Sequence, residues 1–144
     1  MQLTVIGLGL IGASCCAALK KQRLGWVIHG FSIPEATRQQ AFSRGLIDKV
    51  FDTISEALKG SDLALIAVPI GQFRSVYEDV YACHHQGLVV TDAGSTKNSV
   101  VKDIIAVSGS IPSWFIPGHP IAGSERSGVD AANPDLYCAH QVIH

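Results

Sequence analysis

The side chain with the clearest chemical potential is His119, which lies in the segment Pro117-Gly118-His119-Pro120. Proline restricts the backbone and glycine lets it approach a ligand closely, so we expect this imidazole to be held on a stiff, close-packed loop. An imidazole titrates near neutral pH and is therefore a natural proton acceptor in acid–base chemistry. A single loop histidine can instead be structural. Motifs elsewhere in the chain help to decide between a catalytic and a structural role.

A glycine pattern typical of dinucleotide binding lies near the N-terminus. Residues 3–12 read Leu-Thr-Val-Ile-Gly-Leu-Gly-Leu-Ile-Gly, and a helix is predicted over residues 13–21. In such a strand, turn and helix, the positive end of the helix faces a pyrophosphate. We expect Gly7 to allow the tight turn, Gly9 to admit the pyrophosphate, and Gly12 to let helix and strand pack closely. The predicted pyrophosphate cradle is Gly7, Leu8, Gly9, Leu10, Ile11 and Gly12.

Length and composition predict one globular domain over residues 1–144. Of these 144 residues 47% are hydrophobic and 16% are charged, which favours a folded chain with a sizeable core. A net charge of −1 without a basic cluster argues against nucleic-acid binding. No apolar run approaches the ~18 residues of a membrane helix, and the first predicted strand follows Met1 so closely that no signal peptide fits. We therefore expect a cytoplasmic protein that binds neither nucleic acid nor membranes.

The four cysteines indicate neither a redox pair nor a zinc site. Cys15 and Cys16 are adjacent, and the sequence has no Cys-x-x-Cys pair. The spacing of Cys138, His140 and His144 is compatible with metal ligation, but these residues lie where we expect a frayed end. We predict no metal site.

Strand and helix patterns alternate along the chain, which is typical of a doubly wound parallel sheet covered by helices. Besides the strand before Gly7, strands are predicted over residues 26–31, 63–68, 88–92 and 114–116. The predicted helices span residues 13–21, 34–44, 55–59, 72–83 and 98–107. Ligands in such folds bind beyond the carboxyl ends of the strands. We expect four segments that follow strands to converge at that edge: residues 7–12, 68–70, 92–97 and 117–125.

Three of these motifs together carry a family resemblance. Residues 7–14, 91–97 and 117–128 resemble, in order and spacing, the nucleotide-binding domain of the prephenate dehydrogenase family, which includes arogenate and cyclohexadienyl dehydrogenases of tyrosine biosynthesis. The resemblance implies a Rossmann-type α/β domain and NAD(P)-dependent oxidation of prephenate, with decarboxylation, to 4-hydroxyphenylpyruvate. The family's C-terminal helical domain, which supplies dimer contacts and an arginine for a substrate carboxylate, is absent here. We interpret the chain as a fragment of a longer homodimeric enzyme; a lone module with reduced or different activity is the alternative.

The resemblance also implies roles for individual side chains. The positions matched to the substrate site are Ser95, His119, Ser124 and Glu125. His119 matches a general base for the ring hydroxyl of the substrate. Ser95 matches a serine beside that base, although it is also placed to cap the following helix, and Glu125 can be a solvated loop carboxylate. Asp92 and Lys97 are interpreted as structural, holding their loop through a local polar network.

The identity of the cofactor rests on the end of the second predicted strand. An NAD-binding chain usually carries Asp or Glu there for the ribose 2′-hydroxyl, whereas this chain has Ser32. A small hydroxyl leaves room for a 2′-phosphate and favours NADP, but Ile33 occupies the place of the usual arginine, so NAD stays open. Arg38, in the following predicted helix, is a candidate to reach a 2′-phosphate, but the favoured interpretation is a solvated helix residue. Val68 and Pro69 are expected to border the nicotinamide.

Other function classes stay open at this stage. Arogenate can replace prephenate as the substrate, because the residues that discriminate them are expected in the helical domain. A hydroxy-acid dehydrogenase would explain the glycine pattern but not residues 91–97 and 117–128. A non-catalytic NAD(P)-binding module would bind the cofactor without turnover.

Overall fold

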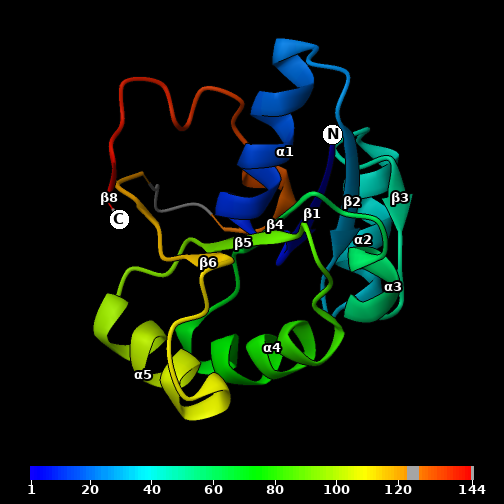
Figure 1. The fold of residues 1–144 in the computed structure, drawn as a ribbon. Helices are drawn as coiled ribbons and strands as arrows, with labels where there is room; N and C mark the ends of the chain where they lie inside the picture. Colours follow the sequence, from blue (N-terminus) through cyan, green and yellow to red (C-terminus); the bar gives the residue numbers. More distant parts are fainter. Residues whose placement is uncertain (123–126, 144) are drawn as a thin grey trace.

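A parallel sheet of six strands, in the order β3-β2-β1-β4-β5-β6, forms the centre of the computed structural model, which describes residues 1–122 and 127–143 (Figure 1). The strands are β1 (Gln2–Ile6), β2 (Val27–Phe31), β3 (Lys49–Val50), β4 (Leu63–Ile66), β5 (Val89–Asp92) and β6 (Phe115–Ile116). All five pairings are parallel. From β1 the chain adds β2 and β3 on one side and then β4, β5 and β6 on the other, so the strand order reverses between β1 and β4. The predicted doubly wound arrangement is confirmed.

Helices cover the two faces of this sheet unequally. They are α1 (Leu10–Gln22), α2 (Glu35–Ser43), α3 (Ile54–Leu58), α4 (Ile70–Cys83) and α5 (Lys97–Ser108). Figure 1 shows α1 on one side of the sheet and α4 and α5 on the other. None of the helices in the described part of the chain is long and apolar enough to cross a membrane.

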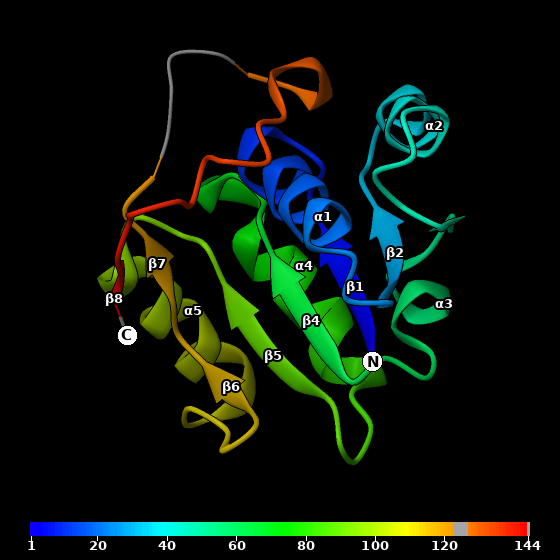
Figure 2. The same ribbon diagram turned by 90° about the horizontal axis from the view of Figure 1, so that it is seen from above.

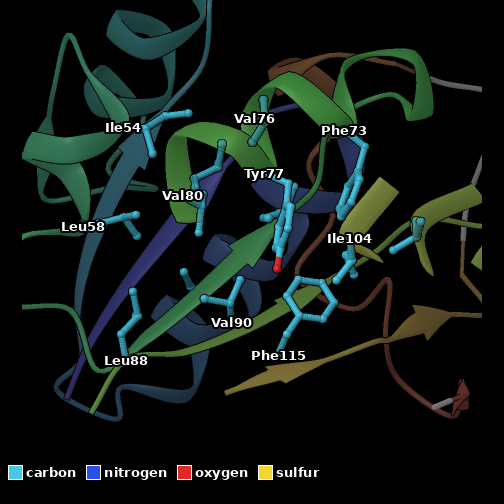
Figure 3. Close-up of a cluster of buried hydrophobic side chains, with 14 residues drawn as sticks. Ile54, Leu58, Phe73, Val76, Tyr77, Val80, Leu88, Val90, Ile104 and Phe115 are labelled. Atoms are coloured by element: carbon cyan, nitrogen blue, oxygen red, sulfur yellow. The ribbon is translucent and has the colours of Figure 1, made fainter. Parts of the chain in front are cut away.

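The main core lies between the sheet and α4. Phe73, Val76, Tyr77 and Val80 follow the three- and four-residue spacing of one helix face, and all four are buried. Figure 3 shows these side chains pointing into the cluster, where the Tyr77 ring meets the Phe115 ring edge-on at a centroid distance of 5.5 Å. This packing fixes β4, β5 and α4, whose ends carry the segments described below.

The opposite face of β4 and β5 is only partly covered. Burial alternates along both strands, so that Ala64 and Val90 are buried while Leu63, Leu65 and Val89 are partly exposed. Figure 2 shows α1 lying over β1, and no helix of the described residues lies over β5 or β6 on this side. Strands of a parallel sheet are normally buried on both faces, so this half of the sheet presents an apolar surface.

Short elements with distant partners were not predicted. The structure adds β3, a single 3₁₀ turn η1 (Val129–Ala131), and an antiparallel pair formed by β7 (His119–Pro120) and β8 (Val142–Ile143). A strand of two residues is too short to show an alternating pattern. The predicted strand over residues 63–68 ends earlier, at Ile66, because the chain turns there toward Pro69.

Candidate functional site

A cavity of about 420 Å³ lies at the carboxyl ends of β1, β2 and β4. Figure 2 shows the arrowheads of β2, β4 and β5 pointing toward this edge of the sheet. Four segments line the cavity: residues 6–9, the end of β2 with the first turns of α2, the end of β4 with the start of α4, and residues 128–130. The lining residues predicted from the sequence are Gly7, Leu8, Gly9, Ser32, Val68 and Pro69.

The glycine turn has the local geometry that dinucleotide binding requires. Gly7 has a φ of 99°, and a Cβ there would overlap the carbonyl oxygen of Ala67. A Cβ on Gly12 would overlap the carbonyl oxygen of Gly7, so Gly12 permits the close approach of α1 to the turn. By contrast, a Cβ on Gly9 would meet no atom of the described residues within 4 Å. Gly9 is also the N-cap of α1 and offers no side-chain cap, which leaves the positive helix end open to an anion.

Gly9 and Gly12 therefore make a matched pair for substitution. Gly9→Ala should destabilise the fold by only about 1 kcal/mol, the usual cost of losing a good N-cap residue. It should weaken NAD(P) binding about tenfold, because its methyl group would stand where the backbone must approach the pyrophosphate. Gly12→Ala should instead destabilise the fold by about 3 kcal/mol, because its Cβ would lie 1.9 Å from the carbonyl oxygen of Gly7 and overpack a backbone contact. Thermal unfolding and calorimetric titration separate the two effects, and equal destabilisation by both substitutions would contradict this assignment.

The interpretation of Arg38 as a solvated residue is wrong. Arg38 is 7% exposed, and its Nη1 donates to the carbonyl oxygens of Ser32 at 2.7 Å and Ile33 at 3.1 Å. Its Nη2 pairs with Asp52 at 2.9 Å, and its guanidinium lies over the Phe31 ring. Arg38 thus fastens the turn after β2 from behind, and these contacts occupy both terminal nitrogens of its guanidinium.

A second group of residues surrounds the buried carboxylate of Asp92 at the end of β5. One carboxylate oxygen, Oδ1, accepts a hydrogen bond from the backbone N–H of Gly118 at 3.0 Å. The other, Oδ2, accepts from the N–H of Gly94 at 2.8 Å and pairs with the Lys97 ammonium group. The predicted polar network is present, and it extends further than its own loop. It joins residues 92–97, which include Ser95, to the segment that carries His119.

His119 is half-buried and begins β7, whose backbone pairs with Ile143 in β8. Ser95 is exposed, and the residue at the N-cap of α5 is Thr96, so the alternative interpretation of Ser95 as the helix cap is wrong. Helix α5 begins one residue later than a Ser95 cap would require. Ser124 and Glu125, which were also predicted to contact substrate, lie outside the described residues.

The cysteines in this region are poor nucleophiles. Burial raises the pKa of the Cys15 thiol to about 11, and burial also raises the pKa of Cys16. Both thiols are therefore protonated at neutral pH. Across residues 1–122 and 127–143, no three His, Cys, Asp or Glu side chains are grouped to hold a metal ion.

Comparison with known proteins assigns the family. The family model described as "Prephenate dehydrogenase, nucleotide-binding domain" matches residues 15–144. The chain belongs to the prephenate dehydrogenase family. Cyclohexadienyl dehydrogenase from Zymomonas mobilis is 33% identical over 142 residues, which are 98% of this chain and 47% of that protein.

Solved structures of family members have the same fold. Prephenate dehydrogenase from Aquifex aeolicus, in complex with hydroxyphenyl propionate and NAD⁺, superimposes with a TM-score of 0.89 at 27% identity, over 99% of this chain and 49% of that one. Arogenate dehydrogenase from Synechocystis superimposes with a TM-score of 0.87 at 29% identity and covers the same shares. The chain spans about half the length of these relatives.

Part of the cavity wall was not predicted from the sequence. Thr37, Gln40 and Gln72 line the cavity from the first turns of α2 and α4. Their polar side chains near the starts of helices that follow strands were a signal that could have identified them as cavity residues. Residues 128–130 also line the cavity, although they lie more than a hundred residues after the glycine turn. No spacing pattern in the sequence predicts that residues 128–130 reach the cavity, because their position depends on the tertiary fold that brings them beside α1.

Proposed function

We propose that this chain is the cofactor-binding and catalytic-histidine half of an NAD(P)-dependent dehydrogenase acting on prephenate. The observation that carries the proposal is the sheet edge that the cavity shares with the 92–97 loop and the His119 segment, which are joined by the Asp92–Gly118 hydrogen bond. The cavity residues suit a dinucleotide: Gly9 leaves open space at the uncapped end of α1, and the turn after β2 is held from behind by Arg38. The nicotinamide ring, when bound, would accept a hydride from the substrate.

His119 supplies the acid–base part of this chemistry. As the substrate carbon loses a hydride, its hydroxyl must lose a proton, and the imidazole accepts that proton. Carbon dioxide then leaves with the ring becoming aromatic, so that step needs no further base. The fixed backbone on both sides of His119, through the Gly118 N–H and the β7–β8 pairing, suits a base that must keep its orientation.

The rest of the enzyme would cover the apolar face of β4 and β5. The relatives are about twice as long as this chain, and a parallel sheet is normally buried on both faces. We infer that a second domain packs there, completes the substrate site and forms the contacts of a homodimer. Arogenate is a second candidate substrate, because the arogenate dehydrogenase of Synechocystis superimposes almost as well as the prephenate dehydrogenase of Aquifex aeolicus.

Two measurements test this function in sequence. Calorimetric titration of the 144-residue chain with NAD⁺ and NADP⁺ should show saturable binding of at least one of them. Turnover of prephenate, arogenate and simple 2-hydroxy acids is then measured by reduced-nicotinamide absorbance with the protein that contains both domains. We expect turnover of prephenate or arogenate only. Cofactor binding without any turnover would favour a non-catalytic module, and turnover of hydroxy acids would favour a different dehydrogenase.

A further inference from the structure

We propose that the turn at residues 128–131 is a wall of the cofactor site and that the Asp130 carboxylate selects NAD⁺ against NADP⁺. The proposal rests on the proposed cofactor site and goes beyond it by assigning the discriminating residue. The carboxylate that NAD-binding chains usually carry at the end of the second strand is replaced here by Ser32. Asp130 lines the same cavity as Ser32 and reaches it from a distant part of the sequence.

The turn is held firmly against the two helices beside the cavity. The side chain of Val129 is buried among Leu8, Ala13 and Ala41, which come from the glycine turn, α1 and α2. Farther along the chain, the Ser14 hydroxyl accepts a hydrogen bond from the backbone N–H of Asn133 at 2.9 Å. These contacts place residues 128–131 beside the glycine turn as a fixed part of the fold.

Two side chains of α2 orient the carboxylate itself. Gln40 Nε2 donates to Asp130 Oδ1 at 2.8 Å, and Arg44 Nη1 lies 3.3 Å from the same oxygen. Arg44 Nη1 also donates to the carbonyl oxygen of Val129 at 2.5 Å. Gln40 and Asp130 both line the cavity, as do Ser32 and Thr37, so these contacts hold the carboxylate in a residue of the cavity wall.

Charge then distinguishes the two cofactors. The ribose diol of NAD⁺ can donate hydrogen bonds to a carboxylate, whereas the 2′-phosphate of NADP⁺ is an anion that a carboxylate repels. Arg38 is committed to the turn after β2. The Arg44 guanidinium, 3.3 Å from Asp130 Oδ1, offsets part of the charge of this carboxylate, and the Asp130 side chain is 82% exposed, so water screens the remainder. Asp130 therefore places a hydrogen-bond acceptor for the ribose hydroxyls and a partly offset negative charge in the cavity that Ser32 lines, and in this proposal it reverses the preference for NADP⁺ expected from Ser32 alone.

The test is calorimetric titration of the 144-residue chain and of its Asp130→Asn variant with NAD⁺ and with NADP⁺. The unchanged chain should bind NAD⁺ more tightly. Asp130→Asn should shift the ratio of the two dissociation constants toward NADP⁺ by about tenfold, the effect of one partly screened charge pair. Asp135→Asn is the matched control, because that exposed carboxylate pairs with Lys21 away from the cavity and should leave the ratio unchanged.

Three results would overturn the proposal. One is tighter binding of NADP⁺ by the unchanged chain, and another is a ratio that Asp130→Asn leaves within twofold. The third is a selective loss of NADP⁺ binding in Arg44→Gln, which would show that Arg44 grips the 2′-phosphate. Binding of neither dinucleotide by the unchanged chain has a different meaning, because it would overturn the cofactor site itself. Ser32→Asp calibrates the assay, since it places a carboxylate at the usual position and should weaken NADP⁺ binding.

Discussion

Replacement of His119 by asparagine should lower the turnover of the proposed two-domain enzyme by about 10²–10⁴-fold, the usual contribution of a general base. Asparagine keeps a polar side chain of similar reach but cannot accept a proton near neutral pH. Affinity for NAD(P) should change little, because His119 does not line the cavity assigned to the cofactor. Steady-state turnover and calorimetric cofactor binding, measured on the same preparation, check both parts.

His140→Asn is the matched control for this substitution. His140 is exposed, bonds only locally to the carbonyl oxygen of Cys138 and is absent from the cavity wall, so its replacement should leave turnover unchanged. If His119→Asn weakened cofactor binding as strongly as it slowed turnover, His119 would be a binding residue. If it did neither, the structural interpretation of this loop histidine would be correct.

The parts of the site that the sequence predicted are those whose constraints are local. Gly12 is required by its contact with the carbonyl oxygen of Gly7, five residues earlier, and Gly7 by its positive φ within the turn, so their spacing indicates this geometry. The contact of Gly7 with Ala67 is distant in the sequence and could not be predicted. The convergence of β1, β2, β4 and β5 at one edge follows from the alternation of strands and helices. Asp92 and Lys97 were interpreted as holding their own loop through a local polar network, and they lie only five residues apart.

The parts that the sequence did not predict depend on distant contacts. Arg38 looks like a solvated helix residue until the turn after β2 and Asp52 are placed around it. The link from Asp92 to Gly118 spans 26 residues, and Asp130 reaches the cavity from across α1. Burial of a charged group depends on partners brought by the tertiary fold, and no spacing within the sequence shows them.

The substitution with the second-largest expected effect is Asp92→Asn, which should destabilise the fold by about 2–4 kcal/mol. Asparagine matches the shape of aspartate but offers one acceptor oxygen, whereas the two oxygens of Asp92 receive the Gly94 N–H, the Gly118 N–H and the Lys97 ammonium group. One donor must therefore face the amide NH₂ group. The Asp92 side chain is fully buried, whereas the Lys97 side chain is 25% exposed. Because water partly solvates the Lys97 ammonium group, the loss of stability should be smaller than for a fully buried ion pair. Denaturant unfolding measures this loss.

The exposed pair of Arg74 and Glu78 provides the comparison, because both side chains are more than half exposed and Glu78→Gln should cost under about 0.5 kcal/mol. Combining Asp92→Asn with Lys97→Met should recover part of the lost stability, since no unpaired ammonium group then remains.

Hydrogen exchange at the Gly118 amide tests whether Asp92 holds the segment that carries His119. The exchange should be faster in Asp92→Asn and stay slow in Glu78→Gln. Unchanged exchange at Gly118 would mean that β7 and β8 alone hold His119 in place. Faster exchange would mean that one buried carboxylate fixes the base and the Ser95 loop together.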